Sequence, residues 1–356
     1  MKLRNISKLA LCTAVLLSTG ANLFAAEDKV DISGSVQASW DHTRGSGNQA
    51  NIKHGGYGGR LQAASKKSVS KDLNGSGVIS LQAGNGGTVN TREAYIRLGS
   101  DKGDFTAGRF LVAPFSDLVN SKHEGFFLAQ HSGIAYAGVY EVDSIESTEN
   151  NHLALHCNHM DNLKMELAAH LDTTAGNGTT TPNTQDIAVR PHLQYSMDNL
   201  KLTAVVEYIT RKDNDASTAA TRDYYKHNTV GFGLGGDFNL GELSLGLSLA
   251  NKSVSGKDIN NTDLSKEKNM TIVGRAAYKV NDDWKVGAVV ASVTGDVGNK
   301  ATEDKQTAYL LEADHSLAEA TMLRMGYSAS TGDTKTGTVT KTLTAQQIKA
   351  QLVYNF

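Results

Sequence analysis

The sequence predicts an all-β fold, a transmembrane antiparallel β-barrel of about sixteen strands. Apolar and polar residues alternate with a period of two along most of the chain, which is the pattern of a strand with different environments on its two faces. The connections between these segments alternate between short polar turns and long polar loops. Beyond residue 24 no stretch approaches the roughly 18 consecutive apolar residues that a membrane-spanning helix needs.

Length and composition narrow the class of protein. The 356 residues suit either two ordinary domains or one large all-β unit. The chain is 39% hydrophobic and its mean hydropathy is −0.33, which excludes a helical membrane protein but not a barrel with one polar face. The 35 basic and 37 acidic residues leave no basic excess of the kind that nucleic-acid binding requires.

Residues 1–25 have the features of a secretory signal peptide. Three basic residues among the first eight precede an apolar core at Leu9–Leu17, and Ala25 ends the segment with a small residue. We expect cleavage after Ala25, rather than a buried N-terminal helix, and a single barrel domain over 26–356. Cleavage leaves Cys157 without a second cysteine for an internal disulfide. It also removes three of the 35 basic residues and none of the 37 acidic ones, which gives a net charge of about −5.

The two ends of the mature chain show the strand pattern most clearly, from Val30 to Trp40 and from Ile348 to Phe356. The same alternation covers 163–172, 187–195, 200–208, 230–238, 243–249, 270–280, 284–292 and 321–329. Weaker segments bring the number of strands to about sixteen, at 52–66, 74–84, 89–99, 104–112, 150–158 and 305–315. Pro191 interrupts one segment, where it predicts a bulge because proline lacks the N–H of the strand ladder.

The connectors fall into two length classes. Short turns are expected at 159–162, 196–199, 239–242, 280–283 and 316–319, and long loops near 173–185, 211–227, 254–267, 295–304 and 331–345. Outer-membrane barrels have this layout, with an even number of strands, periplasmic turns and extracellular loops. A sheet can cross a bilayer only when it closes, because each unpaired backbone group in hydrocarbon costs several kcal/mol. We therefore expect the last strand to pair with the first.

A soluble β-sandwich also alternates and is the alternative fold. The apolar faces recur over too many segments for the two sheets of a sandwich, and the two connector lengths do not suit one. In a barrel, the apolar faces form one continuous outward belt with aromatic residues near its edges. The residues expected at those edges are Trp40, Tyr95, Tyr208, Tyr278, Trp284 and Tyr354.

The connector from Ala113 to about Glu149 is the longest, and connectors of this length are usually functional. Two motifs precede it, T-R-E-A-Y-I-R-L at 91–98 and G-D-F-T-A-G-R at 103–109, and the chain ends on Phe356 with Tyr354 two positions earlier. These features resemble the general bacterial porins, the trimeric diffusion channels of Gram-negative outer membranes. The first motif is similar to the family's T-R-x-A-aromatic-x-x-L strand. The second is similar to the G-x-F-x-x-G-R strand that leads into its constriction loop.

The resemblance implies that the third external loop, at about 113–149, folds into the lumen and sets acidic residues opposite an arginine-rich wall. Arg92 matches the wall arginine of the motif, and the candidates for the basic side are Arg92, Arg60, Lys53 and Arg109. The candidates for the acidic side are Glu124 and Asp117, and the assembly signal is Phe356 with Tyr354. By strand alternation, the lumen also receives Arg190, Lys201, Arg275, Lys285, Glu166 and Glu207.

The implied function is a water-filled channel in the outer membrane for passive diffusion of small hydrophilic solutes and ions. Opposed charges across a narrow constriction order water and favour polar solutes, and they also set ion preference. The implied partners are two further copies in a homotrimer, outer-membrane lipid and lipopolysaccharide, and the outer-membrane assembly machinery, with no cofactor and no nucleic acid. The alternative is a secreted or surface β-protein that acts as an adhesin through its long polar loops.

Signals for an enzyme or a metal site are weak. His152, His156, His159 and Cys157 lie close together in the sequence, and histidine is a common metal ligand. On a strand, however, His152 and His156 share one face while Cys157 points the opposite way, so no metal site is expected. No Ser-His-Asp arrangement or carboxylate pair has a dependable spacing, and we expect no catalytic activity. An esterase-like outer-membrane barrel is the enzyme alternative.

Overall fold

A computed structural model describes residues 30–45, 48–70, 73–83, 89–110, 152–174, 184–213, 226–257, 267–297, 302–336 and 339–356. The predicted signal peptide at 1–25 and the whole predicted constriction loop at 113–149, including Asp117 and Glu124, lie outside these residues. Sixteen β-strands make up nearly all of the described segments. They are β1 (Val30–Gly45), β2 (Asn48–Ser70), β3 (Leu73–Ala83), β4 (Val89–Ser100), β5 (Gly103–Arg109), β6 (His152–Met160), β7 (Leu163–Thr174), β8 (Thr184–Ser196), β9 (Leu200–Asp213), β10 (Lys226–Leu240), β11 (Leu243–Lys257), β12 (Glu267–Lys279), β13 (Trp284–Val297), β14 (Thr302–Ala318), β15 (Thr321–Thr336) and β16 (Val339–Asn355). The described residues contain no helix that is long and apolar enough to cross a membrane.

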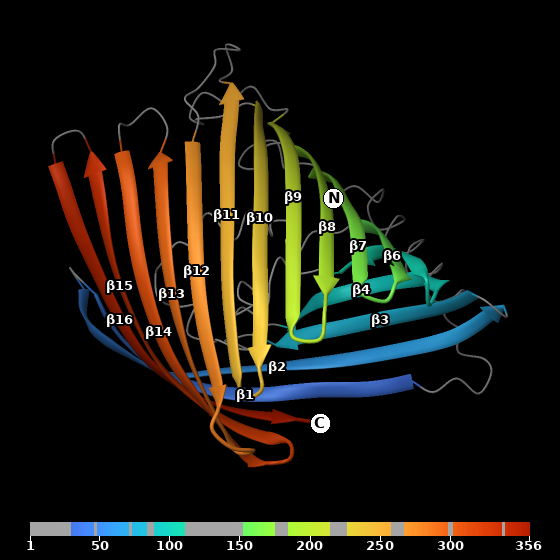
Figure 1. The fold of residues 1–356 in the computed structure, drawn as a ribbon, viewed down its shortest axis with the longest axis horizontal. Coiled ribbons are helices and arrows are strands. Elements are labelled where there is room, and N and C mark those ends of the chain that lie inside the picture. Colours follow the sequence, from blue (N-terminus) through green and yellow to red (C-terminus); the bar gives the residue numbers. More distant parts are fainter. Residues whose placement is uncertain are drawn as a thin grey trace, which may run out of the picture.

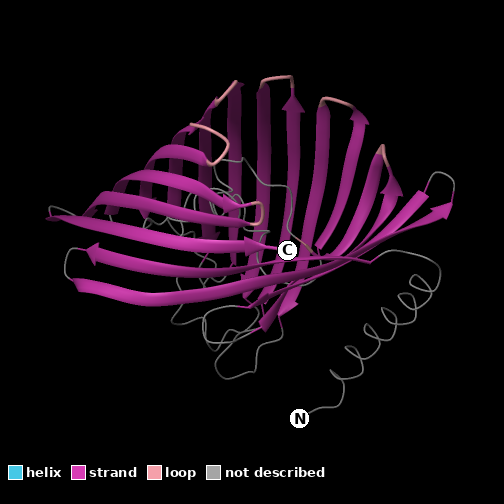
Figure 2. Cartoon of the chain, turned by 90° about the horizontal axis from the view of Figure 1, so that it is seen from below, coloured by secondary structure: helices cyan, strands magenta, loops and turns pink. Residues whose placement is uncertain are grey.

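The described strands form one closed barrel in which each strand pairs with its neighbours in the sequence (Figures 1 and 2). β1 and β16 pair antiparallel and close the ring, from Ser35 opposite Asn355 to Gly45 opposite Ala345. At this seam Gly34 N–H donates to the Phe356 carbonyl oxygen at 2.9 Å, and Phe356 N–H donates to the Gly34 carbonyl oxygen at 3.0 Å. The predicted fold class, strand number and closure are confirmed.

Several strands are longer than predicted at the end opposite the short turns. β15 continues to Thr336 and β16 begins at Val339, and these two residues pair with each other. The long loop predicted over 331–345 is therefore largely wrong, because most of it belongs to a hairpin. Alternation ends where the strands leave the apolar belt, whereas the backbone ladder continues because its hydrogen bonds do not depend on which side chains the strands carry.

Pro191 does not produce the predicted bulge. On the β9 side, Val189 stands opposite Tyr208 and His192 opposite Val205, so the register is the same before and after the proline. On the β7 side, Pro191 stands opposite Leu167 without interruption. The missing N–H removes one step of one ladder, and the rest of the strand keeps its register.

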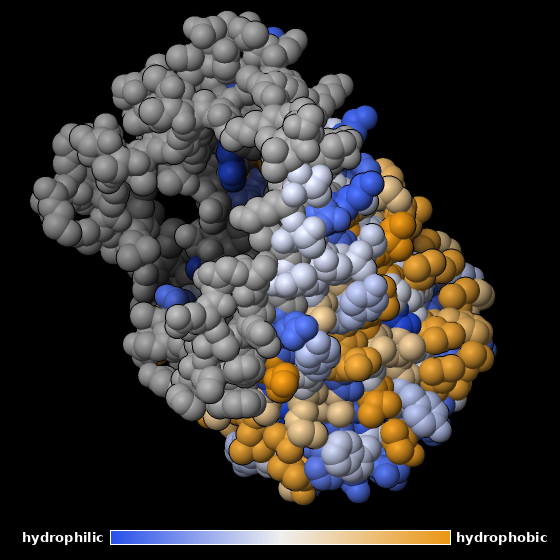
Figure 3. Space-filling model, turned by 90° about the vertical axis from the view of Figure 1, so that its left-hand side faces the viewer, coloured by the Kyte–Doolittle hydropathy of each residue, from blue (hydrophilic) through white to orange (hydrophobic). Residues whose placement is uncertain are grey.

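The two faces of the wall differ in the way a membrane barrel requires. On β9, for example, Leu202 and Val206 are exposed on the outer face, while Thr203 and Glu207 on the inner face are buried. Figure 3 shows apolar side chains, in orange, gathered over the outer surface of the side that faces the viewer. Apolar side chains outside and polar side chains inside are the reverse of a soluble core, and a closed ring excludes the two-sheet sandwich.

The six aromatic residues expected at the outer belt have different outcomes, and the side chain of Trp40 lies outside the described ones. Tyr208, Tyr278 and Tyr354 are exposed on the outer face. Tyr95 is not, because it lies on the face of β4 that Glu93 and Arg97 share, and its ring packs edge-on against Phe110 at 5.9 Å between centroids. The outer face of β4 carries Ile96 and Leu98 instead.

Gly108 in β5 has a φ of +128°, a backbone conformation that residues other than glycine rarely adopt. A Cβ at this position would lie 2.5 Å from the Ala94 carbonyl oxygen and 2.8 Å from the Tyr95 Cα. We expect Gly108→Ala to lower the free energy of unfolding by about 1–3 kcal/mol, measured by urea unfolding in detergent. Gly274→Ala, where a Cβ meets no atom within 4 Å, is the control. Equal stability of the two variants would contradict the strain at Gly108.

Candidate functional site

The inner wall of β2, β3 and β4 is organised around the Arg60 guanidinium. Its Nη2 donates to Glu93 Oε2 at 2.7 Å, in an ion pair, and to Gln62 Oε1 at 2.7 Å. Its Nε donates to Ser80 Oγ at 3.0 Å. The Glu93 carboxylate is mostly buried, whereas 33% of the Arg60 side chain is exposed. Arg60 is therefore held rigidly while part of its positive charge remains open to water.

Arg92 lies at a bulge in β4. Ser80 stands opposite Glu93 and the next residue, Leu81, stands opposite Thr91, so Arg92 is the extra residue on its strand. A bulge re-aims the side chains around it and often occurs next to functional sites. The Nε of Arg109 in β5 donates to the carbonyl oxygen of Arg92 at 3.2 Å. This contact ties two of the predicted basic residues to one point of the wall.

A second group of charges begins near the short β4–β5 turn and crosses neighbouring strands. Arg97 Nε lies 3.3 Å from Asp104 Oδ1 and donates to Thr106 Oγ1 at 3.1 Å. His156 Nδ1 lies 2.7 Å from Asp104 Oδ1, and its Nε2 lies 2.9 Å from Glu166 Oε2. A neutral imidazole carries only one N–H, so the imidazolium form of His156 is the one that can donate to both carboxylates.

The same group of charges continues through Arg190 in β8 to Glu207 in β9. Arg190 Nη1 lies 3.8 Å from Glu166 Oε1, and its Nε lies 4.0 Å from Glu207 Oε2. The side chains of Arg190 and Glu207 are both 0% exposed, whereas 44% of the Arg97 side chain is exposed. We call Arg97, Asp104, His156, Glu166, Arg190 and Glu207 the charge ladder. One end of the ladder meets water and the other is enclosed within the wall.

Aromatic rings line the inner wall next to the charge ladder. Phe110 packs edge-on against His152 at 5.6 Å, and His152 packs edge-on against His170 at 4.7 Å. His152 Nδ1 lies 3.1 Å from the Phe110 carbonyl oxygen and donates to it. The two histidines therefore pack ring against ring. Among the described residues, no group of three or more His, Cys, Asp or Glu side chains could hold a metal ion.

The predicted site residues have different outcomes. Arg60, Arg92 and Arg109 lie on β2, β4 and β5, within a run of four adjoining strands. Lys53 lies in β2, where its backbone stands opposite Asp41. Of the charges predicted for the lumen from later strands, Arg190, Glu166 and Glu207 belong to the charge ladder. Glu93, the partner of Arg60, is not among the predicted site residues, and neither are Arg97, Asp104 and His156. A systematic count of inward-facing charges on β4–β6 would have found the last three.

A closed barrel with an apolar outer face and a charged inner wall is the architecture of an outer-membrane channel. The chain belongs to the Gram-negative porin family, whose family model matches residues 12–335. It is accordingly a multi-pass β-barrel of the outer membrane, and the adhesin alternative is not supported. A search among curated proteins gives no match.

Solved structures of outer-membrane barrels share the fold. The trimer form of OmpT of Vibrio cholerae is 13% identical, with a TM-score of 0.68 over 93% of this chain and 100% of that one. An anion-selective porin from Comamonas acidovorans is 16% identical, with a TM-score of 0.62 over 93% of this chain and 100% of that one. OmpF of Salmonella typhi, in complex with daunomycin, is 12% identical, with a TM-score of 0.62 over 92% and 98%. At these identities the likeness concerns the fold.

Proposed function

We propose that the protein is a passive, non-enzymatic pore for small hydrophilic solutes and ions, and that the wall of β2–β5 is the basic side of its constriction. The observation that carries the proposal is the gathering of arginines on these adjoining strands. Arg60 keeps a substantial part of its side chain exposed, and Arg109 is anchored to Arg92. Lys53, on the same strand as Arg60, is the further candidate for this side.

The acidic side of the constriction is proposed to come from the loop at about 113–149, through Glu124 and Asp117. Carboxylates opposite the arginines of β2–β5 would make a transverse field across the narrowest part of the lumen. Such a field orders water and favours small polar or zwitterionic solutes over bulky apolar ones. No bond is made or broken in this process, and the channel acts through size, charge and hydration alone.

The inner-wall charges divide by exposure into two roles. Arg60 and Arg97 are open to water, so they can contact a permeating ion directly. Arg190 and Glu207 are fully buried, so they stabilise the wall and act on solutes only through their weaker, distant fields. The buried charges predicted from strand alternation are therefore proposed to be structural.

Neutralising Arg92 is the test of the proposed constriction. We expect Arg92→Gln to shift the reversal potential in a salt gradient toward cation selectivity, because one positive charge is removed from the narrowest part of the lumen. The measurement is single-channel recording in planar bilayers. Arg324→Gln makes the same change of charge on β15, where Arg324 Nε lies 3.5 Å from Asp314 Oδ1, and is expected to have a smaller effect. Equal reversal potentials for wild type and Arg92→Gln would show that Arg92 does not lie at the constriction. The absence of stepwise channels in refolded wild type would contradict the pore function.

The remaining proposals concern biogenesis and assembly. Cleavage after Ala25 is proposed to release the mature chain, and Phe356 with Tyr354 is proposed as the signal for the assembly machinery. Both aromatic side chains are exposed at the end of the chain, and their rings stack at 6.3 Å between centroids, which supports this role. A homotrimer is proposed because a trimer form is known for the similar barrel of Vibrio cholerae. Outer-membrane lipid and lipopolysaccharide are proposed to surround its outer belt.

A further inference from the structure

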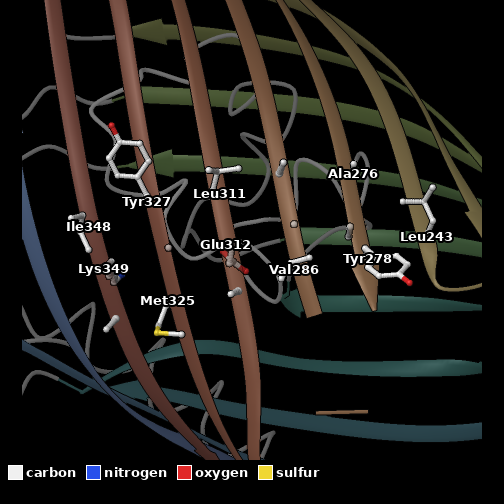
Figure 4. Close-up of a pocket in the computed structure, with 16 residues that line it drawn as sticks. Leu243, Ala276, Tyr278, Val286, Leu311, Glu312, Met325, Tyr327, Ile348 and Lys349 are labelled. Carbon is white, nitrogen blue, oxygen red and sulfur yellow. The ribbon is translucent and has the colours of Figure 1, made fainter. Parts of the chain in front are cut away.

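The outer face of β11–β16 carries a groove of about 800 Å³, shown with its lining residues in Figure 4. This volume is within the range of roughly 300–1,000 Å³ that is usual for ligand pockets. The groove begins near the short-turn end of the barrel, since Tyr278 is the second-last residue of β12 and Val286 is the third residue of β13. It therefore lies in the half of the outer belt that is nearer to the periplasm.

The groove exists because small and large side chains meet in register on the outer face. Ala276 on β12 stands opposite Ala288 on β13, and two strands further on Ala313 on β14 stands opposite Met325 on β15. The floor is formed by the alanines, at 276, 288, 313 and 350. The walls are formed by exposed large side chains, Tyr278, Val286, Leu311, Tyr327 and Ile348. The large side chains stand beside the alanines on the same face, which leaves a groove between them.

The chemistry of the groove is apolar. Glu312 and Lys349 also line it, but both are buried residues whose charged groups belong to the inner face, so they contribute backbone and stem atoms to its floor. The polar side-chain atoms on its outer rim are the hydroxyls of Tyr278 and Tyr327. A tyrosine ring with one apolar body and one polar tip suits the boundary between an acyl chain and a headgroup region.

We propose that this groove binds one acyl chain of a glycerophospholipid from the periplasmic leaflet of the outer membrane. The proposal rests on the outer-membrane location of the barrel and does not depend on the charges assigned to the constriction. A flexible alkyl chain can adapt to the groove, and its methylene groups supply the contacts that the alanine floor would otherwise lack. The position near the short turns favours a lipid of the periplasmic leaflet over lipopolysaccharide, whose acyl chains lie in the leaflet next to the long loops.

A second copy of the chain fits the groove less well. The groove is lined by 16 residues, fewer than the roughly 20–30 residues on each side of a standard protein interface. A peptide strand cannot add to the wall here, because the barrel is closed and every strand already has two neighbours. The occupant that remains is a slender apolar chain from the surrounding bilayer.

The test fills the floor of the groove and counts bound lipid. Wild type, Ala288→Leu and Ala276→Leu are purified in detergent, mixed with palmitoyl-oleoyl phosphatidylethanolamine and analysed by native mass spectrometry. We expect wild type to retain one phospholipid per barrel at low lipid concentration, and each filled variant to need at least tenfold more lipid for the same occupancy. Two filling variants on different strands keep the test decisive if one of them fails to fold.

Matched controls place the same change on the outer face away from the groove. Ala204→Leu on β9 and Ala169→Leu on β7 stand between exposed apolar neighbours on their own strands and do not line the groove. Both are expected to retain phospholipid as wild type does. Channel conductance is expected to be the same in all five proteins, so failure of lipid retention and failure of the pore are seen separately.

Three results would overturn the proposal. Unchanged phospholipid retention in Ala288→Leu and Ala276→Leu would mean that the groove does not hold the chain. Retention of purified lipopolysaccharide that is stronger than that of phospholipid, and is lost on filling, would assign the groove to the other leaflet. A change of oligomeric mass on filling, with unchanged lipid retention, would assign it to a contact between subunits.

Discussion

Replacing Arg60 by glutamine is expected to move the channel toward cation selectivity, because the change acts twice on the same part of the wall. It removes a guanidinium of which 33% of the side chain is exposed, and it leaves Glu93 without the ion pair at 2.7 Å. One unit charge at about 4 Å from a passing ion is worth about 1 kcal/mol in water. We therefore expect the cation-to-anion permeability ratio to rise roughly twofold to fivefold, measured as a reversal potential in a salt gradient.

A double-variant cycle separates charge from structure at this pair. Glu93→Gln alone is expected to shift the reversal potential toward anions, since it leaves Arg60 without its counter-charge. The double variant Arg60→Gln with Glu93→Gln keeps the local net charge of wild type and is expected to return close to wild-type selectivity. If all four proteins had the same reversal potential, the Arg60 and Glu93 pair would lie outside the path of the ions.

Replacing Arg190 by methionine is expected to cause the largest loss of stability among the inner-wall variants. Arg190 is fully buried between Glu166 and Glu207, so its removal takes the cation from between two buried carboxylates, although Glu166 keeps its contact with His156. Breaking a buried ion pair from one side typically costs about 3–5 kcal/mol. The measurement is the free energy of unfolding in urea, with the fraction of folded barrel followed by the mobility of unheated samples in gels.

Two further variants show whether the buried charge is the cause. Adding Glu207→Gln to Arg190→Met removes one of the two buried negative charges that faced Arg190 and is expected to recover part of the lost stability. Asp282→Asn breaks an exposed pair in the β12–β13 turn, where the Lys279 ammonium at 2.7 Å holds the pKa of Asp282 below its usual range. Because this pair is open to water, no measurable loss of stability is expected. A single Arg190→Met variant as stable as wild type would contradict a structural role for the buried end of the charge ladder.

The inner-wall charges show which features of a site can be predicted from sequence patterns and which cannot. Strand alternation identified Arg190, Glu166 and Glu207 as inward residues, because the side chains of a strand strictly alternate between two faces. It could not show that Arg190 is enclosed while Arg97 is open, since exposure depends on what lies across the strand and above it. Nor could it pair Arg60 with Glu93, which are 33 residues apart in the sequence and meet only because β3 holds β2 and β4 two strands apart.

The strands were likewise predicted from the sequence, whereas the positions of their ends were not. The sixteen predicted segments all correspond to strands, but β9, β11, β13 and β15 run further toward the long loops than the alternation does. Apolar and polar residues alternate only where one face of the strand contacts the membrane, so the pattern ends at the edge of the membrane. The backbone ladder continues into water, because hydrogen bonds between neighbouring strands form whichever side chains they carry.

The sequence by itself determined the closed barrel, its strand number and its membership in a family of outer-membrane channels, since period-two alternation, connector length and terminal motifs are local properties of the chain. The tertiary structure alone decided three other features: the bulge at Arg92, the exposed and buried ends of the charge ladder, and the alanine-floored groove on the outer face. Each of these depends on the register between strands, and register sets which side chains become neighbours across the sheet. No single segment of the sequence contains that information.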